Sequence, residues 1–161
     1  MRLSEALGLV WADIHLDHEY PDISLKPHPW RSLKTAGSKR LIPLLGASLE
    51  AIKIMHRQRT TQFLFNTYTD ATGCKGNSCS ATLNKWLKHY VSDAVIHSFR
   101  HSFRDRLRNV GAQSEMIDQL GGWANRTVGQ GYGDGYSLLM KQKALKKIAL
   151  FSSGKKHCAA S

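Results

Sequence analysis

Apolar residues recur at helical spacing in several stretches of the chain. In the stretch that begins near His97, the apolar residues at i, i+4, i+8 and i+11 are Phe99, Phe103, Leu107 and Val110. Similar spacing predicts further helices over residues 2–11, 46–59, 78–91, 114–120 and 137–150. We expect the apolar faces of these helices to build one core, and the aromatic residues Trp86 and Tyr90 to pack within it.

A different pattern lies between Trp11 and Pro43, where apolar and polar residues alternate in short runs. Alternation predicts β-strands, and the three runs are WADIHLD, DISLKP and KRLIPL. The runs PHPWRS and TAGSK supply turn residues between the second and third strands. The sequence therefore predicts a mainly helical α+β domain with a small three-stranded antiparallel sheet.

The charge of the chain narrows the class of partner. The 161 residues carry a formal net charge of +11, with a pI near 9.8. A surplus of lysine and arginine this large indicates a polyanionic partner, and double-stranded DNA is the leading candidate. No apolar run approaches the length of a membrane span, and no signal-peptide pattern opens the chain, so we expect a cytoplasmic protein.

The stretch HSFRHSFRDRLRNVGAQSEMIDQLGGWANRTVGQGYGDGY holds the residue types needed to attack a phosphodiester. It supplies a base, a guanidinium, an indole donor and a phenol, which are His97, Arg100, Trp123 and Tyr132. A tyrosine hydroxyl is a weak nucleophile near neutral pH, because its ordinary pKa is near 10. It therefore needs cationic donors that stabilise the charge of the transition state, and arginine suits this task best.

These residues resemble the catalytic domain of the tyrosine recombinases, or phage-type integrases. The family pattern is Arg, then Lys, then His-x-x-Arg, then His or Trp, then Tyr. Tyr132 follows Arg100 by 32 positions and Trp123 by 9, as in the family. The family also has an upstream R-x-x-E about a hundred residues earlier, and this chain opens with MRLSEALGL, which places Arg2 98 positions before Arg100.

The resemblance implies a role for each matching residue. Arg2, Arg100 and Trp123 would hold the scissile phosphate. Glu5 would orient Arg2, and His97 would accept the proton of the nucleophile. The reaction would need no metal and no cofactor.

Two of these assignments leave alternatives open. Lys34 lies where the family carries the lysine that protonates the departing 5′ oxygen, and Lys39 is the runner-up. Spacing selects Tyr132 as the nucleophile, and the second tyrosine, Tyr136, is then expected to pack in the core.

The resemblance also implies partners and domain organisation. We expect residues 1–151 to form the catalytic domain, without the N-terminal DNA-binding domain of the family, and residues 152–161 to be a disordered tail. Arg104, Lys85 and Lys88 would bind DNA. The chain would act as a homotetramer on DNA, or be a monomer in isolation. The last helix would dock in cis or on a neighbouring protomer.

The implied function is site-specific recombination by a phage or genomic-island integrase through a 3′-phosphotyrosyl intermediate. Two alternatives remain at this point. A type IB topoisomerase would use the same chemistry to relax DNA, and a DNA-binding module would keep the site residues without catalysis.

Overall fold

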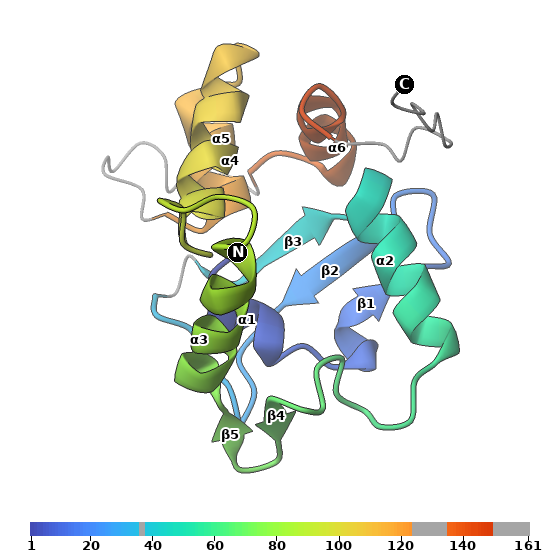
Figure 1. The fold of residues 1–161 in the computed structure, drawn as a ribbon. Helices are drawn as coiled ribbons and strands as arrows, with labels where there is room; N and C mark the ends of the chain where they lie inside the picture. The colour runs from blue at the N-terminus through green and yellow to red at the C-terminus, as the bar shows by residue number, and fades with distance from the viewer. Residues whose placement is uncertain (36–37, 124–134, 150–161) are drawn as a thin grey trace, which may run out of the picture.

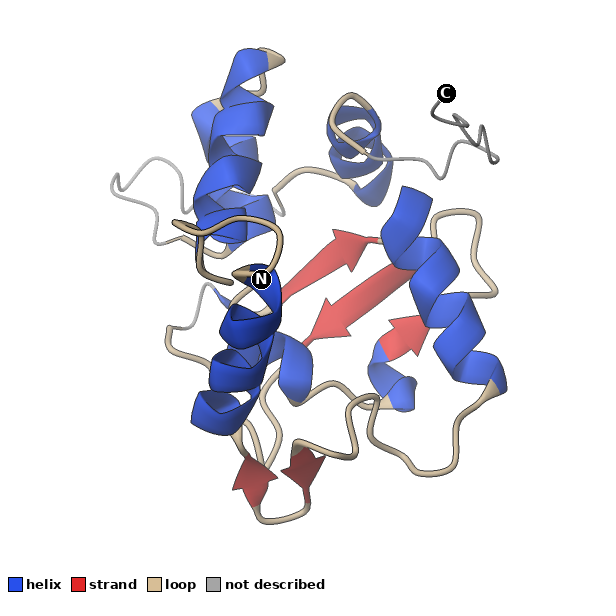
Figure 2. Cartoon of the chain, in the orientation of Figure 1, coloured by secondary structure: helices blue, strands red, loops and turns tan. Residues whose placement is uncertain are grey.

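The computed structural model of the protein describes residues 1–35, 38–123 and 135–149. Within these residues, helices surround a small central sheet (Figures 1 and 2). The predicted mainly helical α+β architecture is confirmed. No helix among the described residues is long and apolar enough to cross a membrane.

The sheet is three-stranded and antiparallel, as predicted. Its strands are β1 (Ile14–His15), β2 (Asp22–Leu25) and β3 (Arg40–Pro43), in the order β1-β2-β3. In the register, Ile23 pairs with Ile14 on one side and with Ile42 on the other. A second, two-stranded sheet joins β4 (Thr69–Asp70) to β5 (Gly73–Cys74).

The first helix is shorter than predicted. α1 spans Leu3–Leu7, whereas the sequence predicted a helix to residue 11. After Gly8 the backbone pairs with residues 62–64: Leu64 donates to the carbonyl of Leu9, and Trp11 donates to Gln62. A 3-10 helix, η1, then covers Trp11–Asp13. The prediction failed because long-range backbone pairing outweighed the local apolar stripe.

Four helices match their predictions more closely. α2 spans Gly46–Arg57, α4 spans Ser98–Asn109, and α5 spans Ser114–Gly121. α3 spans Gly76–Leu87, so it begins two residues earlier and ends four residues earlier than predicted.

The expectation that the aromatic residues of α3 pack in the core is wrong. Trp86 is 53% exposed and Tyr90 is 71% exposed, and their rings contact each other at 5.1 Å. α3 ends at Leu87, which is buried, so Tyr90 no longer continues the buried face of the helix. Helical spacing alone therefore placed Tyr90 on a face that the chain does not extend.

The last helix lies within its predicted range and is shorter. α6 spans Leu138–Lys146; Ala144 packs against buried residues of α4 and α5, whereas Leu139 is 38% exposed. The helix also buries Lys141, Gln142 and Leu145 as it packs against β3. Its long lysine side chain can cover apolar surface with its methylene groups.

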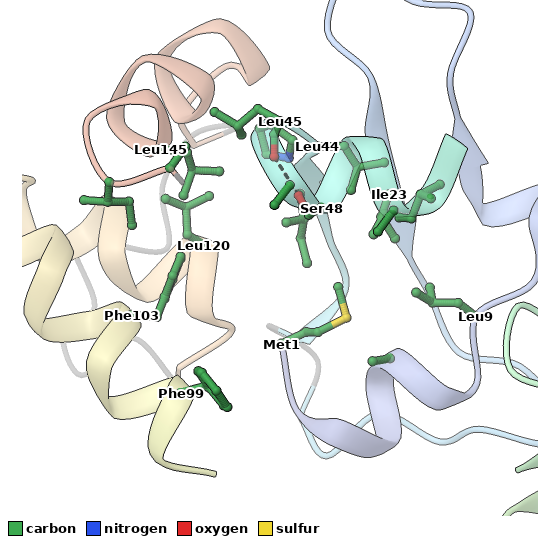
Figure 3. Close-up of a pocket in the computed structure, with 18 of the residues that line it drawn as sticks. Met1, Leu9, Ile23, Leu44, Leu45, Ser48, Phe99, Phe103, Leu120 and Leu145 are labelled. Atoms are coloured by element: carbon green, nitrogen blue, oxygen red, sulfur yellow. Dashed lines mark hydrogen bonds between the residues drawn. The ribbon is translucent and has the colours of Figure 1, made fainter. Parts of the chain in front are cut away.

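Two apolar clusters form the core. The first, around the sheet, α1 and α2, contains Leu9, Ile23, Leu25, Leu44, Ile52 and Leu64. The second joins α4, α5 and α6 and contains Leu107, Met116, Ile117, Leu120 and Leu145. An apolar cavity of about 570 Å³ lies between them, and Figure 3 shows residues of both clusters on facing walls. The two halves of the domain thus meet across a loosely packed boundary.

Candidate active site

Four basic residues of the candidate site share one side of α4, beginning at His97, which precedes the helix. The rings of His97 and His101 lie 5.2 Å apart, one helical turn from each other. Arg100 and Arg104 both lie over the ring of Trp123, with guanidinium carbons 4.2 and 5.0 Å from its centre. Leu107, about one helical turn beyond Arg104 on a neighbouring face, is fully buried, which anchors the helix in the second core cluster.

Arg2 comes to this site from the start of α1. Glu5 holds it in place: the carboxylate accepts from the Arg2 backbone N–H at 2.7 Å and from its guanidinium at 2.6 Å. This arrangement resembles a capping box, which satisfies an N–H group at the helix start. The predicted orienting role of Glu5 therefore has a direct geometric basis.

One pocket of about 340 Å³ brings together Arg2, His97 and Arg100. Apolar residues complete its lining, and they include Leu3, Phe99 and Phe103. Residues separated by almost a hundred positions in the chain thus share one opening. The arrangement places two guanidinium groups and an imidazole around a volume large enough for a phosphate group.

Arg100 is the most informative residue in the pocket. Both of its terminal nitrogens are buried, and neither has a hydrogen-bond partner among the described residues. Burial, followed by repulsion from Arg2, lowers the pKa of Arg100 from its ordinary value. Arginine stays protonated in proteins, so the lowered pKa marks the cost of holding this charge unpaired. An anion that accepts from both nitrogens would remove that cost.

Trp123 lies directly after α5. Its backbone N–H donates to the carbonyl of Asp118, and its ring packs so closely on Gly121 that a Cβ there would lie 1.6 Å from a ring carbon. Only glycine fits at that position. Arg104, which was expected to bind DNA, lies beside the same ring and pairs with Asp118 at 3.6 Å.

The carboxylate of Glu5 lies between two arginines and is 2% exposed. Arg2 approaches one oxygen, and Arg40 of β3 approaches the other at 3.0 Å. Burial alone would raise the pKa of Glu5, but the hydrogen bonds and charges of Arg2 and Arg40 outweigh it, and the pKa falls below its ordinary value of 4.5. Glu5 is therefore the ionic link between α1 and the sheet.

This depressed pKa predicts a pH dependence of folding. A carboxylate with a lower pKa in the folded state stabilises the protein above its unfolded pKa of 4.5, and that contribution is lost as pH falls through the folded value. We expect Glu5→Gln to destabilise the protein near neutral pH, and the gap from wild type to shrink below pH 4.5. Urea unfolding between acid and neutral pH measures this. A gap that stays constant with pH would contradict it.

The candidate general acids lie on the connection between β2 and β3. Lys34 and Lys39 are both exposed. The described part of this connection reaches the site through Ser38, whose hydroxyl accepts from Arg2 at 3.2 Å and lies 3.0 Å from the hydroxyl of Thr35. Lys34 thus flanks a turn that is bonded to Arg2.

The candidate nucleophile, Tyr132, lies outside the described residues. Tyr136 is described, and it packs against the second core cluster while its hydroxyl donates to Gln113. The prediction that Tyr136 serves packing is confirmed. The two remaining candidate DNA-binding residues are exposed: Lys85 lies on α3, which packs against α1, and Lys88 directly follows that helix.

Sequence reasoning missed Arg40. Its neighbour Lys39 is exposed, but the Arg40 side chain is 4% exposed and bonds to Glu5, Ser38 and Leu120. Two adjacent basic residues are usually both exposed to solvent, so the pair itself provided no reason to expect Arg40 to be buried. The available signal was that Arg40 lies within an alternating strand, where every second residue faces inward.

Comparison with known proteins identifies the family. The sequence model of the phage integrase family matches residues 1–136, most of the chain and all of the described site. No curated protein and no solved structure matched the chain. The match begins at the Arg2 motif and ends after the glycine-flanked tyrosine. It therefore includes Arg2, His97 and Arg100, which line one pocket. The chain therefore belongs to the phage integrase family, the tyrosine recombinases.

Proposed function

We propose that this protein is a site-specific DNA recombinase of the integrase type, acting for a phage or a genomic island. It cleaves and rejoins DNA through a covalent 3′-phosphotyrosyl intermediate. Tyr132 is the nucleophile, Arg2 and Arg100 bind the scissile phosphate, and Trp123 supports Arg100 from the side.

The single observation that carries this proposal is that both terminal nitrogens of Arg100 are buried without a hydrogen-bond partner among the described residues, in the pocket shared with Arg2. Arg2 is paired with Glu5 at 2.6 Å, whereas the nitrogens of Arg100 have no hydrogen-bond partner, so the arrangement favours an anionic ligand that binds Arg100 beside Arg2. The transition state of phosphodiester cleavage carries more negative charge than the diester. Fixed cations at this position therefore act most strongly in the transition state.

The proposed reaction is a transesterification without a cofactor. The phenolic oxygen of Tyr132 bonds to phosphorus while its proton passes to His97. The bond from phosphorus to the 5′ oxygen breaks, and Lys34 donates a proton to that oxygen. The products are a 3′-phosphotyrosyl bond and a free 5′-hydroxyl. Attack by the 5′-hydroxyl of another strand reverses the step and exchanges strands, so the chemistry needs no external energy.

The exposed position of His97 fits this assignment. His97 precedes α4 and lines the pocket, so a phenol that enters the pocket can reach it. Histidine exchanges protons near neutral pH, whereas the indole of Trp123 cannot. His97 is therefore the better proton acceptor of the two.

A covalent-capture assay tests the proposal. A pool of short duplexes carries one 5′-bridging phosphorothiolate, flanked by random sequence. Attack at this linkage expels a thiolate that does not re-attack efficiently, so the covalent adduct accumulates. We expect adducts that survive denaturing gels, and sequencing of the attached DNA to yield a preferred site. Binding of the duplex without any adduct would contradict catalysis and favour a DNA-binding module.

The same chemistry decides the general acid. On the preferred site, we expect Lys34→Ala to slow cleavage of the ordinary linkage by roughly 10² to 10⁴-fold. The loss on the phosphorothiolate should be far smaller, because a thiolate leaves without needing a proton. Lys39→Ala is the matched control and should cleave both linkages like wild type. If Lys39→Ala instead cleaves the ordinary linkage slowly and the phosphorothiolate like wild type, Lys39 is the general acid. If the lysine variants lose equal rates on both linkages, proton donation by lysine is contradicted.

A further inference from the structure

Arg40 joins three parts of the fold through one buried guanidinium. Nε donates to the carbonyl of Leu120 at 3.1 Å, one terminal nitrogen donates to the carbonyl of Ser38 at 2.6 Å, and the other donates to Glu5 at 3.0 Å. These partners lie at the end of α5, at the base of the β2–β3 connection and in α1. One side chain thus connects the two halves of the domain.

Arg40 and Arg2 bind the same carboxylate and two neighbouring carbonyls near the end of α5. Each binds one oxygen of the Glu5 carboxylate, and each reaches a carbonyl at the end of α5: Arg40 at Leu120, and Arg2 at Gly122, 3.4 Å away. The carbonyls at a helix C-terminus carry partial negative charge, so both cations are stabilised there. The position of Arg2 therefore depends on groups that Arg40 also holds.

The end of α5 fits tightly against Arg40. Gly122 adopts a left-handed conformation, with φ of 64°, and a Cβ there would lie 2.4 Å from an Arg40 nitrogen. Trp123 follows at once and lies against Arg100. Arg40 thus fixes the position of Gly122, the residue directly before Trp123.

Burying this arginine is costly. Burial, chiefly, lowers the pKa of Arg40, and burial followed by the charge of Arg40 lowers the pKa of Lys141 on α6. Buried ion pairs can often be replaced by apolar side chains without loss of stability. Stability alone therefore does not explain a buried arginine at position 40, whereas the alignment of Arg2 and Trp123 does.

We propose that Arg40 is a positioning residue for DNA cleavage, which rests on the proposed function. It holds the Glu5 carboxylate against Arg2 and the end of α5 against the sheet, so that Arg2, Arg100 and Trp123 keep one spatial arrangement. It does not contact DNA itself, because its side chain is 4% exposed. Its loss should therefore reduce the rate of cleavage without weakening DNA binding.

The experiment compares Arg40→Lys and Arg40→Met with wild type. In the covalent-capture assay, we expect adduct formation to slow by roughly tenfold to a hundredfold, because small misplacements of fixed groups reduce rates by such factors. Duplex affinity at constant salt should change by less than about twofold, because the phosphate-facing charges remain. Arg40→Lys keeps the positive charge, so it still tests the proposal if Arg40→Met fails to fold. An adduct rate within about twofold of wild type for folded Arg40→Lys would overturn the proposal.

A readout without DNA separates this proposal from the proposed function. The chain has four tryptophans, and the indole N–H resonance of Trp123 can be assigned with Trp123→Phe. We expect Arg40→Lys to shift that resonance and to leave the resonance of Trp30, which donates to the carbonyl of Gly8, unchanged. If wild type forms no adduct, the proposed function fails, and the Trp123 resonance alone decides whether Arg40 positions the site. An unchanged Trp123 resonance overturns the proposal in either case.

Arg31 provides a matched control. It is also a buried arginine bonded to α1, but it donates to the backbone carbonyl of Glu5 at 2.9 Å and pairs with Asp13. Arg31→Lys should lower the unfolding temperature while the Trp123 resonance stays in place. A Trp123 shift of equal size in Arg31→Lys would show a general loosening of α1 and contradict a specific role for Arg40.

Discussion

Tyr132→Phe is expected to form no covalent adduct with DNA, while its affinity for duplex stays close to that of wild type. Phenylalanine lacks the oxygen that bonds to phosphorus, and no other group in the proposed reaction replaces it. The phosphate-binding arginines are untouched, so binding persists. The measurement is adduct formation on the preferred site, with duplex affinity determined in parallel at the same salt concentration.

Tyr136→Phe is the matched control for this variant. Tyr136 lies four positions further on, and its ring packs against the second core cluster. Removing its hydroxyl breaks the bond to Gln113, but it leaves the apolar contacts of the ring. We expect the adduct to form at a rate near that of wild type. Loss of the adduct in Tyr136→Phe together with its persistence in Tyr132→Phe would reassign the nucleophile to Tyr136.

Arg100→Gln is expected to reduce adduct formation by on the order of 10³-fold or more, because a buried cation that stabilises transition-state charge is worth several kcal/mol. The same variant should unfold at a temperature equal to or above that of wild type. The free protein holds the terminal nitrogens of Arg100 buried, without hydrogen-bond partners among the described residues and near Arg2, so the glutamine relieves repulsion. Loss of activity without loss of stability is expected of a residue that serves ligand binding and not folding.

Arg31→Gln is the comparison for stability. Arg31 is 3% exposed and, unlike the terminal nitrogens of Arg100, its guanidinium is bonded to the carbonyls of Glu5 and Lys26 and paired with Asp13. Its removal leaves a buried carboxylate with fewer partners, so the unfolding temperature should fall. An equal fall in Arg100→Gln would mean that Arg100 serves the fold, and it would contradict its assignment to a phosphate.

The sequence predicted those elements whose local pattern agrees with their tertiary contacts. The three alternating runs became the three strands of the sheet. α2 and α4 pack in the core through Ile52 and Leu107, although Phe99 of the predicted α4 face is 58% exposed. The order of His97, Arg100 and Trp123 also predicted a shared site, and the structure brings these residues together with Arg2. Motif spacing sufficed there because α4 itself sets the separation of His97 and Arg100.

Other features depended on contacts between distant segments. α1 ends early because residues 9–11 pair with residues 62–64, and no local pattern announces such pairing. Helical spacing predicted that Tyr90 is buried, but α3 ends at Leu87, before Tyr90. Lys141 is buried because α6 packs on β3, although a lysine in a basic helix suggests exposure.

Arg40 illustrates the same limit within the site. Its partners Glu5 and Leu120 lie 35 and 80 positions away, so its role became visible only when the fold joined them. The contact between Arg2 and Glu5 was predicted from their shared motif, but the bonds from Arg40 to Glu5 and Leu120 depend on the three-dimensional fold.

The central claim is that Arg2 and Arg100 bind the same phosphate, and a neutral substrate tests it most directly. Replacing the scissile phosphate by a methylphosphonate removes the negative charge that these arginines are proposed to neutralise. The rate penalties of Arg2→Gln and Arg100→Gln should both shrink by at least about tenfold on this substrate, because the charge interaction they delete is no longer present. A methylphosphonate at the adjacent linkage should leave both penalties unchanged. Full penalties at the neutral scissile linkage, or relief of one variant only, would contradict a single phosphate held by both residues.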